Sequence, residues 1–217
     1  LAVALSFSSD VVGCDVDKAR LLRLEKGDLS FLGEEAKGIP SIPHIALTLE
    51  SKEAIAGADA VFICVNTDYK EELKSFDVSS LTKVIEGCVE ANPTTPLVIK
   101  STVPLGYTSA MQARFPSTPI LFCPEFLRER YAYSDALNPS RIVIGGEPRF
   151  TTIMEEIVAV LHGFCKNNPP IRLLSSLEAE ASKLFSNTYL ALRVAFFNEL
   201  DSLSKTYGMD SGKLIER

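Results

Sequence analysis

The sequence predicts an α/β protein with a doubly wound, mainly parallel sheet, followed by one long spine helix. Three observations lead to this prediction. Short apolar, β-rich runs alternate with helical patterns along most of the 217 residues, which is typical of a parallel sheet with crossover helices. Several runs are apolar at consecutive positions, as expected of strands that helices cover on both faces. After Pro169 and Pro170 a short apolar run leads into one continuous helical pattern.

Each element of this plan has a local signal. Apolar runs indicate the strands, helical patterns lie between them, and glycine or proline in the linkers indicates where the helices stop. We expect strands at residues 11–14, 44–49, 60–65, 96–100, 119–122 and 141–144. We expect helices at residues 18–25, 52–56, 79–91, 108–114 and 151–164.

The spine helix is expected from about residue 177 to residue 207. Ser175 and Glu178 form a capping box before it, and Gly208 is a natural C-cap. Residues 189–197 are apolar nearly all round, so we expect this part to be covered on every side, as a spine between domains or subunits. Asp210 is expected to cap one further short helix.

The composition excludes several classes of protein. The formal net charge is -6, from 28 acidic and 22 basic residues, which argues against a nucleic-acid partner because such binding needs a basic surface. No apolar run approaches the ~18 residues of a membrane span, and no signal peptide is evident. We therefore expect a cytoplasmic protein with no membrane partner.

The cysteines and histidines predict neither disulfides nor a metal site. The cysteines are odd in number, widely spaced and in apolar surroundings, which predicts buried free thiols in a reducing compartment. They are Cys14, Cys64, Cys88, Cys123 and Cys165. His44 and His162 lie far apart without a Cys/His cluster around either, so no metal is expected.

The glycine-rich phosphate loop G-x-G-x-x-G is missing from this chain. Residues 11–15 nevertheless look like a second Rossmann strand that ends in Asp15, the carboxylate that accepts hydrogen bonds from an adenosine ribose. That acid normally follows the loop by about 20 residues. We therefore expect the chain to begin after its own first strand and loop, with residues 1–5 the rest of a first crossover helix. An ordinary acid at a strand end is the alternative for Asp15.

Polar residues follow three of the expected strands, within residues 61–67, 98–104 and 123–129. Open α/β sheets bind ligands at such strand ends, although turn-forming residues alone would give the same pattern. On the spine helix, Lys183 and Asn187 share one face, and Glu180 lies one turn before Lys183. These groups could serve a carbonyl oxyanion and a proton, or they could be a solvated charge pattern.

Four motifs in order closely resemble the UDP-glucose/GDP-mannose dehydrogenase family. They lie at residues 100–106 (KSTVPLG), 124–129 (PEFLRE), 138–145 (NPSRIVIG) and 178–189, which runs on to 197–200. The resemblance covers essentially the whole chain. The wording of residues 187–200 is most similar to the short bacterial UDP-glucose 6-dehydrogenases.

The resemblance implies part of a cytosolic enzyme that oxidises the C6 alcohol of UDP-glucose to UDP-glucuronate with two NAD+ in succession. An aldehyde is captured by a cysteine, and a second hydride transfer gives a thioester that water hydrolyses. It also implies a Rossmann-like NAD-binding domain at residues 1–174 and the start of a central helical domain at residues 175–217. A homodimer through the spine helix is expected.

The resemblance also assigns roles to individual residues. Glu125 matches a carboxylate for acid/base work, Thr102 a holder of the catalytic water, and Lys183 and Asn187 the pair at the C6 oxygen. The matches for cofactor binding are Asp15, Arg20, Val65, Asn66, Thr67, Ser101, Thr102, Val103 and Glu129. The matches for substrate binding are Glu125, Phe126, Leu127, Arg128, Lys183 and Asn187.

Two departures from the family qualify this prediction. Asp68 stands where the family usually has proline, although short bacterial members vary there. The family's nucleophilic cysteine lies in a Gly-Gly-x-Cys-x-Pro-Lys-Asp motif beyond the point where this chain ends, and Cys123 is not in such a context, so we expect this piece alone to be inactive. The alternatives are a related enzyme for GDP-mannose or a UDP-N-acetylhexosamine, and a non-catalytic nucleotide-binding or dimerisation module.

Overall fold

The computed structural model describes residues 1–6, 8–31, 39, 45–72 and 74–215. The chain divides into two compact units, Leu1–Glu180 and Ala181–Arg217, and each is described by itself.

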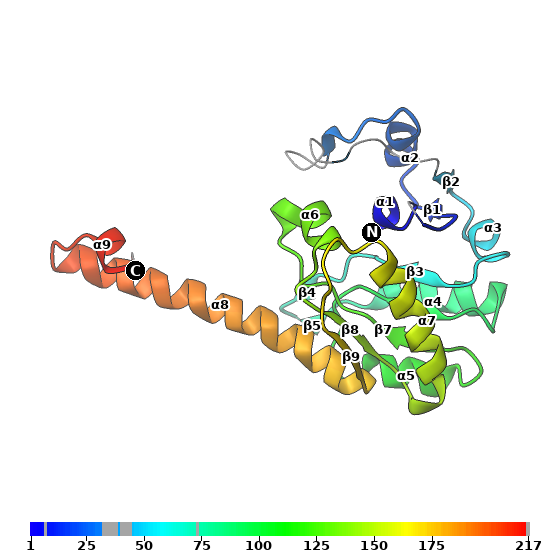
Figure 1. Cartoon of the computed structure of the whole chain (residues 1–217). Coiled ribbons are helices and arrows are strands. Elements are labelled where there is room, and N and C mark those ends of the chain that lie inside the picture. The colour runs from blue at the N-terminus through cyan, green and yellow to red at the C-terminus, as the bar shows by residue number, and fades with distance from the viewer. Residues whose placement is uncertain (7, 32–38, 40–44, 73, 216–217) are drawn as a thin grey trace. The chain divides into compact units, whose positions relative to one another are not determined.

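The first unit contains a five-stranded sheet of order β3-β6-β7-β8-β9. Its strands are β3 (Val61–Ile63), β6 (Leu97–Ile99), β7 (Ile120–Phe122), β8 (Ile142–Gly145) and β9 (Ile171–Leu174). All neighbours are parallel except β7 and β8, which are antiparallel. The predicted α/β class with a mainly parallel sheet is thus confirmed (Figure 1).

Two smaller pairs of strands belong to the same unit. β1 (Val12–Cys14) and β2 (Ala46–Thr48) pair in parallel, and β4 (Tyr69–Lys70) and β5 (Ser75–Phe76) form an antiparallel hairpin. The structure confirms all six expected strands within about two residues, but residue 44 of the second lies outside the described residues. The β4–β5 hairpin was not predicted, and β9 was expected only as an apolar run.

Helices connect and cover these strands. They are α1 (Ala2–Leu5), α2 (Lys18–Glu25), α3 (Ser51–Ile55), α4 (Ser79–Ala91), α5 (Tyr107–Arg114), α6 (Ala132–Leu137) and α7 (Thr151–Gly163), with 3-10 turns η2 (Glu129–Tyr131) and η3 (Pro148–Phe150). All the expected helices are confirmed, whereas α6 and the 3-10 turns were not predicted. Residues 2–5 are helical, as expected.

Alternate residues of the central strands face two apolar clusters. Ile99 and Phe122 join one cluster with the buried side of α4. Val98 and Leu121 join the other cluster with the buried side of α7. Because successive side chains of a strand point to opposite faces, this arrangement explains why the strands are apolar throughout, and Figure 1 shows helices on both sides of the sheet.

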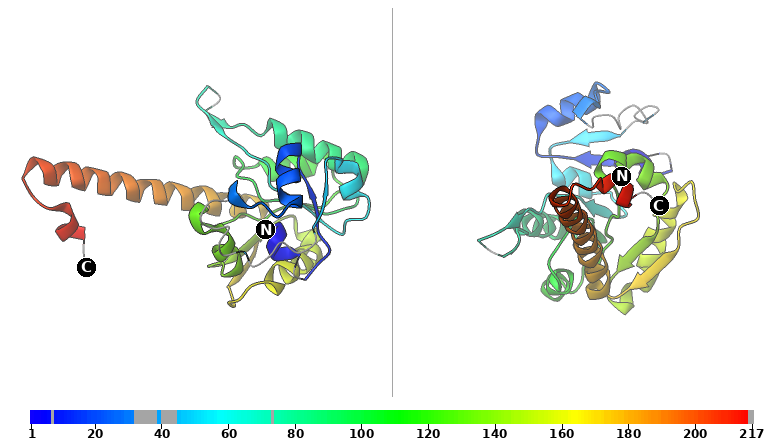
Figure 2. Two further views of the ribbon diagram at one scale, coloured as in Figure 1. Left: turned by 90° about the horizontal axis from the view of Figure 1, so that it is seen from above. Right: turned by 90° about the vertical axis from the view of Figure 1, so that its left-hand side faces the viewer.

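The long helix α8 (Ser176–Thr206) is one unbroken helix, followed by the short α9 (Ser211–Ile215) (Figure 2). The capping box is present, because the Ser175 backbone N–H donates to Glu178 Oε2 at 2.9 Å and the Glu178 N–H donates to Ser175 Oγ at 3.3 Å. Gly208 has a φ of 65°, the left-handed conformation of a C-cap. Asp210 caps α9 by accepting the Gly212 N–H at 2.9 Å.

The apolar middle of α8 is exposed within this chain. Its exposed large side chains are Tyr189, Leu190, Leu192, Val194, Phe196 and Phe197. The expectation that this part is covered on every side is therefore not met by residues of the second unit itself. Within the described residues, no helix is both long and apolar enough to cross a membrane.

The five cysteines are free thiols, as predicted, but their burial differs from the prediction. Cys88 and Cys123 are buried, while Cys14 and Cys64 are exposed. The prediction of burial is wrong for these last two, because Cys14 belongs to β1, where Val12 is exposed as well, and Cys64 lies just beyond the end of β3. Cys165 is half-buried. The Cys64 thiol is still crowded by protein atoms, and this burial raises the pKa of Cys64 to about 11.

Candidate functional site

The carboxyl ends of β3, β6 and β7 meet at one edge of the sheet. Ile63 pairs with Ile99, and Ile99 pairs with Phe122, so the three segments that follow these residues leave the sheet side by side. In open α/β sheets this edge is where ligands bind. The three polar segments singled out in the sequence are therefore brought together.

Two short hydrogen bonds join the segments after β3 and β6. Ser101 Oγ donates to the Val65 carbonyl at 2.6 Å, and Thr67 Oγ1 donates to the Thr102 carbonyl at 2.6 Å. Ser101 and Val103 are buried, whereas Asn66 is exposed. The residues predicted to line the cofactor are thus held by their own hydrogen bonds, and Asn66 is accessible at the surface.

Lys100, at the end of β6, places an ammonium group in the interior of this edge. Its Nζ donates to Cys123 Sγ at 3.5 Å and lies 3.6 Å from Glu125 Oε1. Burial lowers the pKa of Lys100, but Cys123, Glu125 and Cys64 raise it by more, so its pKa lies above the ordinary value. Sequence reasoning included Lys100 in a motif but gave it no role, although a lysine that directly follows an apolar strand was a usable signal.

The segment after Glu125 is organised by two arginines. Arg128 makes a two-point contact with Asp135, with Nε 3.0 Å from Oδ2 and Nη2 2.7 Å from Oδ1. Hydrogen bonds from Arg128 hold the pKa of Asp135 below its ordinary value. The Arg141 guanidinium carbon lies 3.8 Å from the centre of the Phe126 ring, within the range of a cation–π contact.

Two further predicted residues belong to this segment. Leu127 is half-buried. Glu129 begins the η2 turn. The structure describes its backbone but not its side chain, so the predicted role of the Glu129 side chain lies outside the described part of the chain.

Glu180 ends the first unit with a fully buried carboxylate. Its Oε2 accepts the Gly106 N–H at 2.6 Å and its Oε1 accepts the Thr108 N–H at 2.8 Å. These N–H groups lie at the start of α5, where donors have no partner within the helix, and Gly106 has a φ of 86°. The interpretation of Glu180 as one of a set of charges near Lys183 missed this contact.

The other two predicted catalytic residues lie in the second unit. Lys183 is half-buried and Asn187 is exposed on α8. Their spacing of four residues places them on the same face of the helix.

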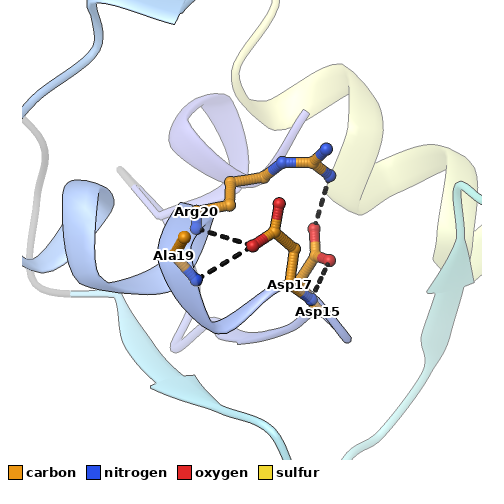
Figure 3. Close-up of polar contacts among 4 residues, drawn as sticks. All are labelled: Asp15, Asp17, Ala19 and Arg20. Atoms are coloured by element: carbon orange, nitrogen blue, oxygen red, sulfur yellow. Dashed lines mark hydrogen bonds and ion pairs between the residues drawn. The ribbon is translucent and has the colours of Figure 1, made fainter.

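Asp15 follows β1 and is the predicted ribose acid (Figure 3). Its Oδ1 accepts the Asp17 N–H at 2.9 Å and its Oδ2 accepts from Arg20 Nη1 at 2.8 Å. Asp17 in turn caps α2 by accepting the N–H groups of Ala19 and Arg20. The structure therefore brings Asp15 and Arg20 together at a partly exposed strand end.

Among the described residues, no group of three or more histidine, cysteine, aspartate or glutamate side chains could hold a metal ion. Part of the metal expectation falls on His44, which lies outside those residues.

Comparison with known proteins gives matches along the whole chain. The family model of the NAD binding domain of the UDP-glucose/GDP-mannose dehydrogenase family matches residues 1–162, and the model of the central domain of that family matches residues 177–217. The chain is 37% identical to the UDP-glucose 6-dehydrogenase of Campylobacter jejuni and 36% identical to that of Streptococcus pneumoniae, covering 100% of this chain and 56% of each relative.

Comparison with solved structures gives the same kind of match. The chain resembles a UDP-glucose dehydrogenase from Pyrobaculum islandicum with a TM-score of 0.81 and 28% identity, over 98% of this chain and 52% of that chain. It has the fold of a GDP-mannose dehydrogenase from Pseudomonas aeruginosa, with a TM-score of 0.79 and 23% identity, over 99% of this chain and 52% of that chain. The chain thus spans about half the length of the relatives it matches.

Proposed function

The chain belongs to the UDP-glucose/GDP-mannose dehydrogenase family, and from this premise we propose that it is the N-terminal part of an NAD-dependent UDP-glucose 6-dehydrogenase. The observation that carries the proposal is the edge of the five-stranded sheet. There the Ser101–Val65 and Thr67–Thr102 hydrogen bonds join two loops beside the Glu125 carboxylate. We assign residues 1–174 to the cofactor domain and residues 175–217 to the start of the central domain.

The described residues fit the adenosine half of NAD. Asp15 already accepts two hydrogen bonds, but a carboxylate has about four acceptor positions, so capacity remains for ribose hydroxyls. Arg20 lies beside it and fixes its orientation. Val65, Asn66, Thr67, Ser101 and Val103 would line the rest of the cofactor, together with Glu129. NAD, when bound, accepts the hydride that leaves the C6 carbon.

The other residues act on the sugar nucleotide. We assign Glu125 to proton transfer, which a positioned carboxylate can accelerate by about 10²–10⁴-fold, and Thr102 to holding a water. Phe126, Leu127 and Arg128 would line the substrate. Lys183 and Asn187 would donate hydrogen bonds to the C6 oxygen, where preorganised donors stabilise developing negative charge.

We also propose that α8 pairs with a second copy of the chain. The support is its exposed apolar middle, which includes Leu192 at 62%, Val194 at 61% and Phe196 at 64% exposure. Water-exposed apolar side chains in such number usually mark an interface. Sedimentation of the full-length protein should give a dimer, and Val194→Glu should shift it toward the monomer. A wild-type monomer at micromolar concentration would contradict this assembly.

The activity is tested with the full-length protein and a panel of nucleotide sugars. We expect NADH formation with UDP-glucose and much less with GDP-mannose or a UDP-N-acetylhexosamine. Preference for either of the others would keep the enzyme class and change the substrate. The absence of NADH formation with every sugar would contradict the proposed function and favour a non-catalytic module.

The role of Lys183 is tested by substitution. Lys183→Ala should lower turnover by on the order of 100-fold, as loss of an oxyanion donor typically does. Lys205→Ala is the matched control on the same helix, because the Lys205 side chain is 76% exposed and forms an ion pair with Asp201 at 2.6 Å. Equal turnover in the two variants would show that Lys183 does not serve the C6 oxygen and is an ordinary surface charge.

A further inference from the structure

Lys100 lies in a row of three residues that crosses three strands. The Lys100 N–H donates to the Ile63 carbonyl and the Cys123 N–H donates to the Ile99 carbonyl, both at 2.9 Å. The parallel ladder therefore continues one step beyond the strands, and Lys100 lies between Cys64 and Cys123. Cys123 belongs to the apolar cluster under α7, so the lysine side chain lies on a face of the sheet that is otherwise apolar.

An ammonium group at this position needs an anion. The Lys100 side chain is only 7% exposed, and a buried charge without a partner strongly destabilises a fold. A thiol sulfur is only a weak hydrogen-bond acceptor, whereas a carboxylate oxygen is a strong one, so the contact with Cys123 alone does not satisfy the ammonium group. Glu125, with Oε1 at 3.6 Å, is the anion that the described contacts of Lys100 provide.

The two partners differ in how firmly they are held. The backbone of Lys100 is fixed in the strand ladder and its side chain is enclosed. Glu125 lies beyond the ladder, in a segment without regular structure, and its side chain is 34% exposed. The lysine is therefore the more firmly held member of the pair, and Glu125 is the more exposed member, with its carboxylate beside the buried ammonium group.

We propose that Lys100 is a positioning residue, whose buried ammonium group holds the Glu125 carboxylate in one place at the open edge of the sheet. The catalytic part of this inference rests on the proposed function, in which Glu125 transfers a proton. Lys100 then acts through Glu125 and not by contact with substrate.

The kinetic test uses the full-length protein. Lys100→Met keeps the length and apolar stem of the side chain and removes its charge. We expect kcat to fall by on the order of 10²-fold, the lower end of what a positioned proton-transfer group supplies, while KM for UDP-glucose and NAD stays the same. Lys100→Arg should recover part of the loss because it restores the charge. An unchanged kcat in a folded Lys100→Met variant would overturn the proposal while leaving the proposed function intact.

An exposed ion pair provides the control. Lys52 Nζ lies 3.1 Å from Glu90 Oε1, with side chains 69% and 71% exposed. Lys52→Met should leave kcat unchanged. The control pair is closer than Lys100 and Glu125 but solvated, so a difference between the two lysines reports burial and position and not mere pairing.

A second test does not depend on activity. Glu125→Gln is made in the wild-type and the Lys100→Met backgrounds, and the urea midpoint of unfolding is measured. If the pair is coupled, the shift caused by Glu125→Gln should be at least twofold smaller once the lysine charge is gone. Glu90→Gln in the wild-type and Lys52→Met backgrounds should give equal shifts.

These measurements separate the possible failures. A full-length protein that oxidises no nucleotide sugar would refute the proposed function, and the urea measurements alone would then decide whether Lys100 holds Glu125. If Lys100→Met does not fold, Glu125→Gln must lower the midpoint more than Glu90→Gln does, because it leaves a buried ammonium group without its anion. Equal shifts in that comparison, or equal shifts of Glu125→Gln in both backgrounds, would overturn the proposal.

Discussion

Asp15 and Glu180 are carboxylates in two regions of the molecule. Each accepts two hydrogen bonds, of which at least one comes from a backbone N–H, but one carboxylate is partly exposed and the other is buried. Asp15 accepts from an exposed arginine and from its own loop, and its side chain is 27% exposed. Glu180 is fully buried and accepts two N–H groups that are more than 70 residues away in sequence. The difference indicates that Glu180 maintains the fold, whereas the Asp15 carboxylate is partly exposed to solvent.

The largest effect should come from Glu180. Glu180→Ala leaves the Gly106 and Thr108 N–H groups buried without an acceptor, so we expect a loss of about 3–5 kcal/mol in the free energy of unfolding, measured with urea. Glu178→Ala is the matched control, because Glu178 is an exposed carboxylate on the same helix, two residues earlier, and its loss should be clearly smaller. Similar losses in the free energy of unfolding for the two variants would show that the buried Glu180 carboxylate contributes no more to stability than the exposed Glu178 carboxylate.

Gly145 tests the packing that brings Glu180 to α5. A Cβ at Gly145 would lie 2.7 Å from the Ser175 carbonyl and 2.6 Å from Ala179 Cβ, so Gly145→Ala should cost about 1–3 kcal/mol. Gly87, inside α4, has open space around it, and Gly87→Ala should stabilise by about 0.5–1 kcal/mol. In thermal unfolding, we expect Gly145→Ala to lower the melting temperature and Gly87→Ala to raise it. An unchanged melting temperature for Gly145→Ala would show that the first turn of α8 can move away from the added methyl group.

Asp135 is intermediate between the two carboxylates, because its side chain is largely enclosed while its partner Arg128 is exposed. Its pKa is lowered in the folded state, so the pair stabilises the fold above the ordinary aspartate pKa of about 4 and loses this contribution as the pH falls through the lowered value. Asp135→Asn should therefore flatten the fall in the free energy of unfolding below about pH 4. An unchanged pH profile would contradict the assigned contact.

The smallest effect on stability should come from Arg20. Exposed ion pairs contribute about 0–1 kcal/mol, so Arg20→Ala should barely change the urea midpoint. Asp15→Asn, in contrast, should weaken NAD binding in a fluorescence titration of the full-length protein. A large loss of stability in either variant would place Asp15 with Glu180 as a structural carboxylate.

Features with local signals could be predicted from the sequence. Ser175, Glu178 and Gly208 marked the ends of α8 because caps depend on neighbouring residues. Periodic apolar runs likewise placed the strands and the helices between them. The β4–β5 hairpin escaped because each strand has two residues and little apolar pattern.

The unpredicted parts of the candidate site are long-range contacts. Glu180 meets Gly106 across 74 residues, and Lys100 meets Cys123 across 23. No local pattern encodes such pairs, because they depend on which strand ends and helix ends meet in space. The burial of Cys14 and Cys64 was misjudged for the same reason, since apolar sequence neighbours do not reveal which strands and strand ends the rest of the fold covers.

If the edge of the five-stranded sheet serves the proposed dehydrogenase, the full-length protein should oxidise an alcohol to a carboxylate. Converting the C6 alcohol of UDP-glucose to a carboxylate removes four electrons and adds the oxygen of one water, so two NAD+ are reduced for each sugar. The most direct measurement is the number of NADH formed per UDP-glucose consumed by the full-length protein. Two NADH per UDP-glucose are expected, and a ratio of one with accumulation of free aldehyde would refute the proposed function.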